Sequence, residues 1–184
     1  MNESTLKQYE VVVARCRELY RKKMADYGPS WRILRPSSVT DQLFIKVKRI
    51  RTLQVNGTSR VGDDIWTEFV AIVNYGFIGL IQLELGYSDD IDMTASDALK
   101  MYDHLASETK ELMVAKNTDY GEAWRDMRIS GITDIILTKV QRVKEIERHN
   151  GSTTVSEGIG SNYQDMINYA IFALIRHDEG SDED

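Results

Sequence analysis

The sequence predicts an all-α fold in which two copies of a three-helix unit pack as a pseudo-twofold helical bundle. Three observations lead to this prediction: a polar signature that occurs twice, apolar residues at helical spacing, and residues typical of helix caps between the apolar segments. The strand signal is weak, because the β-branched run at 132–137 continues into the helical spacing of Ile136, Val140 and Val143.

The two copies share a long stretch of matching residues. The segment KMADYGPSWRILR at 23–35 returns as KNTDYGEAWRDMR at 116–128. At the same offset the match continues through Thr40 and Thr133, Lys46 and Lys139, and Arg49 and Arg142. After one residue inserted in the second copy, it continues with Asn56 and Asn150, and with Asn74 and Asn168. The predicted units are repeat 1 at 1–90, repeat 2 at 91–178 and a disordered acidic tail at 179–184. One repeat alone cannot bury its apolar face, so we expect the two to form one cooperative domain.

Each copy is predicted to contain three helices. In chain order, the expected helices are at about 5–26, 40–56, 64–85, 95–119, 133–150 and 159–177. Thr94 and Asp97 have the spacing of a capping box before the fourth of these helices. Thr-Asp pairs at 40–41 and 133–134 suit helix N-termini, and Asn-Gly pairs at 56–57 and 150–151 suit helix C-termini.

Composition limits the class of protein. A hydrophobic fraction of 42% is enough for a core, and a net charge of −6 argues against a general grip on DNA or RNA. The apolar stretch at 69–85 is interrupted by Asn74 and Gly79, and the N-terminus lacks the features of a signal peptide. We therefore expect a soluble cytoplasmic protein without a membrane segment and without strong nucleic-acid binding. The sequence is compatible with a homodimer. Cys16 is interpreted as a structural thiol.

Two basic pairs recur at the same place in the repeats. Lys46 and Arg49 are three residues apart on a predicted helix, as are Lys139 and Arg142. Such a pair could hold a phosphate group, with the arginine supplying a forked donor. The alternative is a solvated helix face that makes ordinary ion pairs.

A carboxylate and an amide interrupt the most apolar part of the last predicted helix. Asp165 and Asn168 are three residues apart, and a buried charge there needs a partner. Lys139 and Arg142 could supply one as a structural ion-pair network. A divalent cation is the alternative, since Mg²⁺ takes one or two carboxylates together with phosphate and water.

The loop after the first helix of each repeat carries an aspartate, a tryptophan and an arginine. These residues are Asp26, Trp31 and Arg35 in repeat 1, and Asp119, Trp124 and Arg128 in repeat 2. They could contact a base and a sugar of a nucleotide. Alternatively, the tyrosine and tryptophan of the loop close the end of a helix pair while the aspartate caps a turn, and this second interpretation is slightly favoured.

These motifs resemble a known family. The residues that carry the resemblance are Asp119-Tyr120-Gly121 with Trp124, Lys139 with Arg142, Glu157 with Ile159, and Asp165 with Asn168-Tyr169-Ala170. Together they are similar to the nucleotide modification associated domain 1 family, which is largely uncharacterised. More remotely, the order of helices resembles the all-α nucleoside triphosphate pyrophosphohydrolases of the MazG and dimeric dUTPase type.

The remote resemblance implies a magnesium site built from Glu-x-x-Glu on one helix and Glu-x-x-Asp on the next. The matching positions are Arg142-x-x-Glu145 and Asn162-x-x-Asp165 in repeat 2, and Arg49-x-x-Thr52 and Glu68-x-x-Ala71 in repeat 1. Both sets are incomplete, and repeat 1 is expected to lack catalytic carboxylates. In repeat 2, Glu157 is a further oxygen donor.

The leading hypothesis from the sequence is therefore a Mg²⁺-dependent nucleotide pyrophosphohydrolase or a related nucleotide-processing protein. Its catalytic residues would be Glu145 and Asp165, and Glu145, Glu157 and Asp165 would hold Mg²⁺. The expected ligand is a nucleotide or another small phosphorylated molecule. The residues expected to contact it are Lys139, Arg142, Asn168, Asp119, Trp124 and Arg128 in repeat 2, and Lys46, Arg49, Asn74, Asp26, Trp31 and Arg35 in repeat 1. The alternative is a non-catalytic nucleotide-binding or scaffold protein with a degenerate site of this kind.

Overall fold

The computed structural model describes residues 3–57, 64–155 and 157–180. Within these ranges the chain forms helices and no strand, which confirms the predicted all-α fold. The α-helices are α1 (Glu3–Tyr27), α2 (Pro36–Asn56), α3 (Ile65–Leu85), α4 (Ala95–Tyr120), α5 (Ile129–Arg148) and α6 (Ile159–Asp178). Two short 3-10 helices, η1 (Ser30–Ile33) and η2 (Ala123–Asp126), follow α1 and α4.

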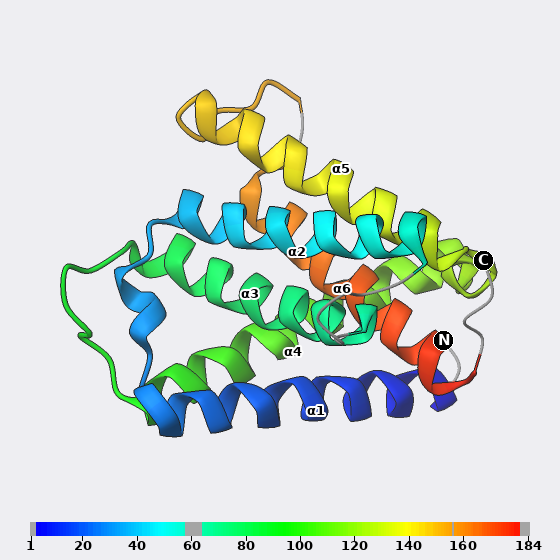
Figure 1. The fold of residues 1–184 in the computed structure, drawn as a ribbon, viewed down its shortest axis with the longest axis horizontal. Coiled ribbons are helices and arrows are strands. Elements are labelled where there is room, and N and C mark those ends of the chain that lie inside the picture. The colour runs from blue at the N-terminus through cyan, green and yellow to red at the C-terminus, as the bar shows by residue number, and fades with distance from the viewer. Residues whose placement is uncertain (1–2, 58–63, 156, 181–184) are drawn as a thin grey trace.

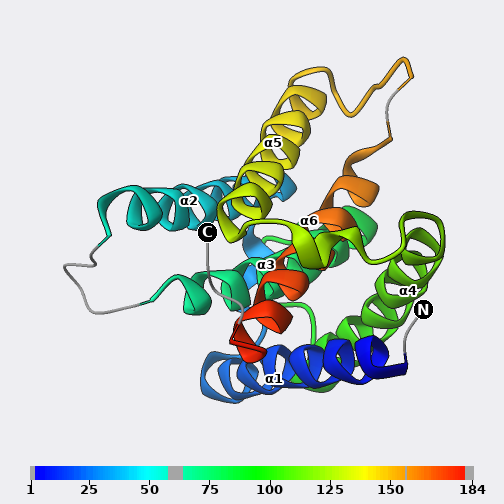
Figure 2. The same ribbon diagram turned by 90° about the vertical axis from the view of Figure 1, so that its right-hand side faces the viewer.

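The helices form three layers (Figures 1 and 2). α3 and α6 lie in the middle, α1 and α4 cover one side of them, and α2 and α5 cover the other. Each layer therefore contains one helix from each repeat. The most apolar helices lie at the centre, where both of their sides can be buried.

Two buried hydrogen bonds between the repeats form a matched pair. The hydroxyl of Tyr9 donates to Oδ1 of Asn168 at 2.8 Å, and the hydroxyl of Tyr102 donates to Oδ1 of Asn74 at 3.0 Å. The contacts between helices are matched as well: α1 packs on α6, and α4 packs on α3. The two repeats are thus related by a pseudo-twofold axis, as predicted.

The helix ends agree with the cap residues in some places and not in others. Thr94 caps α4 by accepting the backbone N–H of Asp97 at 3.1 Å, as predicted. α2 and α5 begin one turn earlier than predicted, at Pro36 and Ile129. Thr40 and Thr133 are therefore buried inside helices and do not cap them. The Pro36 ring suits the first turn of a helix, and the Thr40 hydroxyl oxygen lies 3.3 Å from the Pro36 carbonyl oxygen, one turn earlier in the same helix.

α3 is long and apolar enough to cross a membrane by length and composition, contrary to the expectation for this stretch. It is the one described helix that meets this test, and 67% of its most apolar window is buried inside the protein. Its packing against α2 and α6 explains its composition as that of a core helix.

Cys16 in α1 is fully buried, and burial raises the pKa of its thiol to about 12, as expected of a structural thiol.

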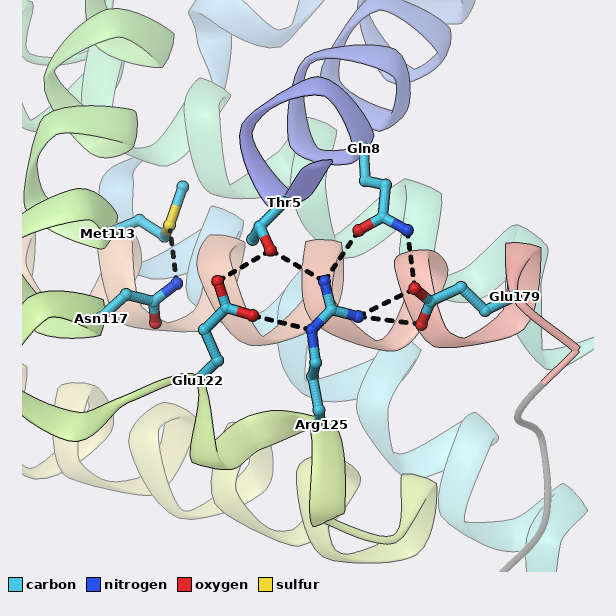
Figure 3. Close-up of polar contacts among 7 residues, drawn as sticks. All are labelled: Thr5, Gln8, Met113, Asn117, Glu122, Arg125 and Glu179. Carbon is cyan, nitrogen blue, oxygen red and sulfur yellow. Dashed lines mark hydrogen bonds and ion pairs between the residues drawn. The ribbon is translucent and has the colours of Figure 1, made fainter. Parts of the chain in front are cut away.

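The first residue of the acidic tail, Glu179, contacts an arginine of η2 (Figure 3). Arg125 of η2 contacts both carboxylate oxygens of Glu179, at 2.9 and 3.0 Å. The same guanidinium donates to Thr5 and Gln8 of α1, and its Nε donates to Glu122 at 2.9 Å. Glu179, the first residue of the predicted tail, is therefore in contact with η2. Residues 181–184 of the predicted tail lie outside the described residues.

Candidate functional site

Each repeat contains a cavity at the same place, between the C-terminal half of its first helix, its 3-10 helix, and its second and third helices. Cavity 1 in repeat 1 has a volume of about 370 Å³, and cavity 2 in repeat 2 has a volume of about 420 Å³. The matching pairs that line them include Lys23 and Lys116, Tyr27 and Tyr120, Trp31 and Trp124, Lys46 and Lys139, Ala71 and Asp165, Asn74 and Asn168, and Tyr75 and Tyr169. Several residues predicted to contact a ligand are thus brought together twice.

The tryptophan of each loop forms the inner wall of its cavity. Trp124 is 5% exposed, stacks on Phe172 with ring centroids 4.3 Å apart, and has the guanidinium of Arg125 4.3 Å above its ring. Both faces of Trp124 are therefore covered, so a base could stack on it only by displacing one of these neighbours. Tyr120, in contrast, is 75% exposed at the same cavity and offers a free aromatic ring.

The asparagines on the cavity walls hold the two repeats together. Asn74 donates to the Cys16 carbonyl at 3.0 Å, and Asn168 donates to the Thr109 carbonyl at 3.3 Å. Their side-chain oxygens accept from Tyr102 and Tyr9, as described above. Each amide therefore donates one hydrogen bond and accepts another within the protein.

The carboxylate of cavity 2 is neutralised by two lysines. Asp165 on α6 has a side chain that is 8% exposed, and its two oxygens contact Nζ of Lys116 and Nζ of Lys139, each at 2.5 Å. Burial lowers the pKa of Lys116, but the hydrogen bond to Asp165 and the negative charge nearby outweigh this effect, and the pKa is raised. The predicted pairing of Asp165 with Lys139 is found, whereas the second partner is Lys116 and not Arg142.

Cavity 1 has its carboxylate one helical turn earlier. Glu68 on α3 has a side chain that is 3% exposed, and it pairs with Lys46 at 3.1 Å and with Arg49 at 2.6 Å. The counterpart of Glu68 in repeat 2 is Asn162, and the counterpart of Asp165 in repeat 1 is Ala71. The third helix of each repeat thus directs one carboxylate to basic side chains, but the two carboxylates are not at equivalent positions of the repeats.

The three carboxylates expected to hold Mg²⁺ are distributed over two hollows. Glu145 pairs with Arg148 and lines an open hollow of about 840 Å³ beside the C-terminal end of α5. Asp165 lines cavity 2, and Glu157 borders both spaces. In the described ranges no group of three or more His, Cys, Asp or Glu side chains is placed to hold a metal ion. These donors therefore do not fit a three-carboxylate magnesium site in this arrangement.

The remaining predicted residues lie around the cavities and not in them. Arg142 lines the open hollow with Glu145, so it and Lys139 face different spaces. Arg35 and Arg128 occupy the N-cap positions of α2 and α5, and Asp26 and Asp119 are exposed near the ends of α1 and α4. Arg49 is not part of the lining of cavity 1, but it pairs with Glu68, which is.

Sequence reasoning did not single out the first-helix lysines or the arginine after each tryptophan. Lys23 and Lys116 line the cavities, and Arg32, 3% exposed, pairs with Asp92 at 2.8 Å and donates to the Gly86 carbonyl at 2.6 Å. Arg32 thereby ties the loop of repeat 1 to the linker between repeats, as Arg125 ties the loop of repeat 2 to the end of α6. The recurrence of both residue types in the two copies was the available signal.

The fold and the paired cavities define an internally duplicated all-α protein in which each copy has a cavity lined by both charged and apolar side chains. The sequence matches the nucleotide modification associated domain 1 family over 23–83 and again over 116–176. The two matches cover most of the chain, and the chain belongs to this family. No curated protein and no solved structure matches it.

Proposed function

We propose that the protein binds a small phosphorylated ligand of the nucleotide type in one or both of its cavities, and that this binding needs no divalent cation. The observation that carries the proposal is the repeated set of lysines, exposed tyrosine and asparagine around a cavity of suitable size. Lysines attract phosphate, and an exposed tyrosine ring can pack on a base. The description of the family as associated with nucleotide modification supports the same class of ligand.

Thermal denaturation with a panel of nucleoside mono-, di- and triphosphates tests this proposal. We expect at least one nucleotide to raise Tm in the presence of EDTA, without being turned over. At a ligand concentration 100 times Kd the expected gain is about 2.7 kcal/mol, or roughly 5–10 °C for a chain of this size. The matching nucleosides without phosphate serve as the control. Absence of stabilisation by every nucleotide would contradict the proposal.

Mg²⁺-dependent nucleotide hydrolysis is the second candidate, favoured by the position of Glu157 at the border of both hollows. For Asp165 to bind a metal in this mechanism, it would have to release Lys116 and Lys139. The same nucleotide panel with MgCl₂, followed by chromatography of the products, decides between the two candidates. Product formation that is lost in Asp165→Ala supports hydrolysis and excludes a purely binding role.

A further inference from the structure

We infer that the two cavities are unequal: cavity 1 accepts the phosphate of the ligand, and Asp165 blocks cavity 2 by acting as its internal anion. This inference rests on the proposed function and assigns its ligand to one repeat. It starts from a single difference between matched positions, because Ala71 on α3 stands where α6 has Asp165.

In cavity 2 the two lysines are already neutralised by a carboxylate of the protein. Both oxygens of Asp165 are in contact with lysine ammonium groups, and Glu157 adds a second carboxylate to the lining. The four charged side chains that line the cavity therefore sum to zero. A phosphate that entered would have to displace a nearly buried carboxylate from two lysines, and it would meet the repulsion of a like charge.

In cavity 1 one lysine has no acid to neutralise it. Lys23 is exposed, and in the part of the chain that the structure describes it has no ion-pair partner. Lys46 shares the single carboxylate of Glu68 with Arg49. The lining thus contains two lysines and one acid, and Ala71 leaves open the space that Asp165 occupies in cavity 2. A phosphate between Lys23 and Lys46 would form charge-assisted hydrogen bonds without displacing a carboxylate.

The rest of cavity 1 suits the base of a single nucleotide. Its volume of about 370 Å³ is at the small end of the range for small-molecule sites, which is about 300–1,000 Å³. Tyr27, 53% exposed, and Ile33, 54% exposed, border it and provide an apolar surface for a flat ring. The phosphate would then lie toward the lysines of α1 and α2, and the base toward η1.

Isothermal titration calorimetry with the most stabilising nucleotide, and separately with inorganic pyrophosphate, tests this assignment. We expect one site per chain in the wild type. Lys23→Ala should weaken binding by roughly tenfold to a hundredfold, because it removes a charged hydrogen-bond donor. Lys116→Ala should weaken binding by less than twofold. Lys22→Ala is the control for lost positive charge, because Lys22 is the adjacent exposed lysine. Its Nζ lies 3.9 Å from Oε1 of Glu18.

Exchange of the distinguishing residue provides the second test. Ala71→Asp should abolish binding, and Asp165→Ala should produce a second site; Asp165→Asn offers a more conservative variant in case the alanine variant does not fold. Two equal sites in the wild type, or equal losses in Lys23→Ala and Lys116→Ala, would overturn the inference and leave the proposed function intact. Pyrophosphate binding with the expected pattern, but no nucleotide binding, would instead overturn the proposed ligand class and keep the assignment to cavity 1.

Discussion

At the contact between α2 and α5, a hydrogen bond on one side of the pseudo-twofold axis has a counterpart on the other side. A neutral amide makes the first bond, and a carboxylate makes the second. Gln54 donates to the hydroxyl of Thr133 at 3.1 Å, and at the matched place the hydroxyl of Thr40 donates to a carboxylate oxygen of Glu147 at 2.6 Å. Burial raises the pKa of Glu147, the nearby Asp41 adds to this effect, and the Thr40 hydrogen bond only partly opposes it. The ionised carboxylate is therefore less stable here than in the unfolded chain.

The sign of this shift gives a pH-dependent prediction for Glu147→Gln. A glutamate whose pKa is raised by folding lowers stability progressively as pH rises from the ordinary value, about 4.3, through the raised value. Glutamine is neutral and its oxygen still accepts the hydrogen bond from Thr40. We therefore expect Glu147→Gln to have a higher Tm than the wild type at pH 7, and the difference to disappear below about pH 4.

Circular dichroism melts at both pH values measure this effect, and Gln54→Glu is the matched control. Gln54→Glu places a carboxylate at the equivalent position, so it should lower Tm at pH 7. If Glu147→Gln were the less stable protein at pH 7, attraction between Glu147 and Lys144 would outweigh the cost of burial.

The buried acids show which part of the site was predictable from the sequence. That Asp165 needs a basic partner follows from its place in an apolar helix, and Lys139 was one of the two expected partners. Lys116 was not expected, because α4 and α6 meet only in the tertiary fold. Residue spacing along α5 suggested that Arg142 would act with Lys139, but a turn of helix is enough to direct two side chains into different spaces.

At the scale of helices, the close crossing of α3 and α6 depends on glycine. A Cβ atom at Gly79 would lie 2.6 Å from Cε1 of Tyr163, and a Cβ atom at Gly76 would lie 2.4 Å from Cγ1 of Ile167. The ring of Tyr163 cannot move away freely, because it is fully buried and its hydroxyl is hydrogen bonded to Thr40 at 2.7 Å. The central layer is therefore packed too tightly for any side chain at Gly79.

We predict that Gly79→Ala lowers the stability of the protein despite the higher helix propensity of alanine. Overpacking costs about 1–3 kcal/mol, whereas replacing glycine in a helix gains at most about 1 kcal/mol. Gly131→Ala in α5 is the control, since a Cβ atom there meets no atom within 4 Å, and it should be neutral or stabilising. Urea unfolding of the two variants measures the difference. A Gly79→Ala variant as stable as Gly131→Ala would show that the crossing can widen at no cost.

Helix identity was predictable from the sequence, but the start of α2 and α5 was not. Apolar spacing locates all six helices because each buries one face or more. The Thr-Asp pairs resembled N-caps, but a threonine can also donate to a carbonyl one turn earlier in its own helix. Thr133 does so to Ile129 at 3.0 Å, whereas the Thr40 hydroxyl donates to Glu147 of α5 at 2.6 Å.

At the scale of the whole molecule, each repeat completes the cavity region of the other. Tyr9 of repeat 1 holds Asn168 on the wall of cavity 2, and Tyr102 of repeat 2 holds Asn74 on the wall of cavity 1. The contact of Arg125 with Thr5 adds a further link between the repeats (Figure 3). Neither repeat can therefore have a complete set of buried hydrogen bonds without the other.

This interdependence predicts a single cooperative unfolding transition. Separating the repeats would expose the facing apolar surfaces of α3 and α6 and leave buried amides unpaired, so a half-folded state should be too unstable to accumulate. Differential scanning calorimetry should give equal calorimetric and van't Hoff enthalpies, with a total of about 130 kcal/mol for a chain of this length near 60 °C. A Tyr9→Phe variant should shift this one transition to lower temperature without splitting it. Two transitions, or a van't Hoff enthalpy near half of the calorimetric value, would mean that the repeats are independent domains joined by the linker.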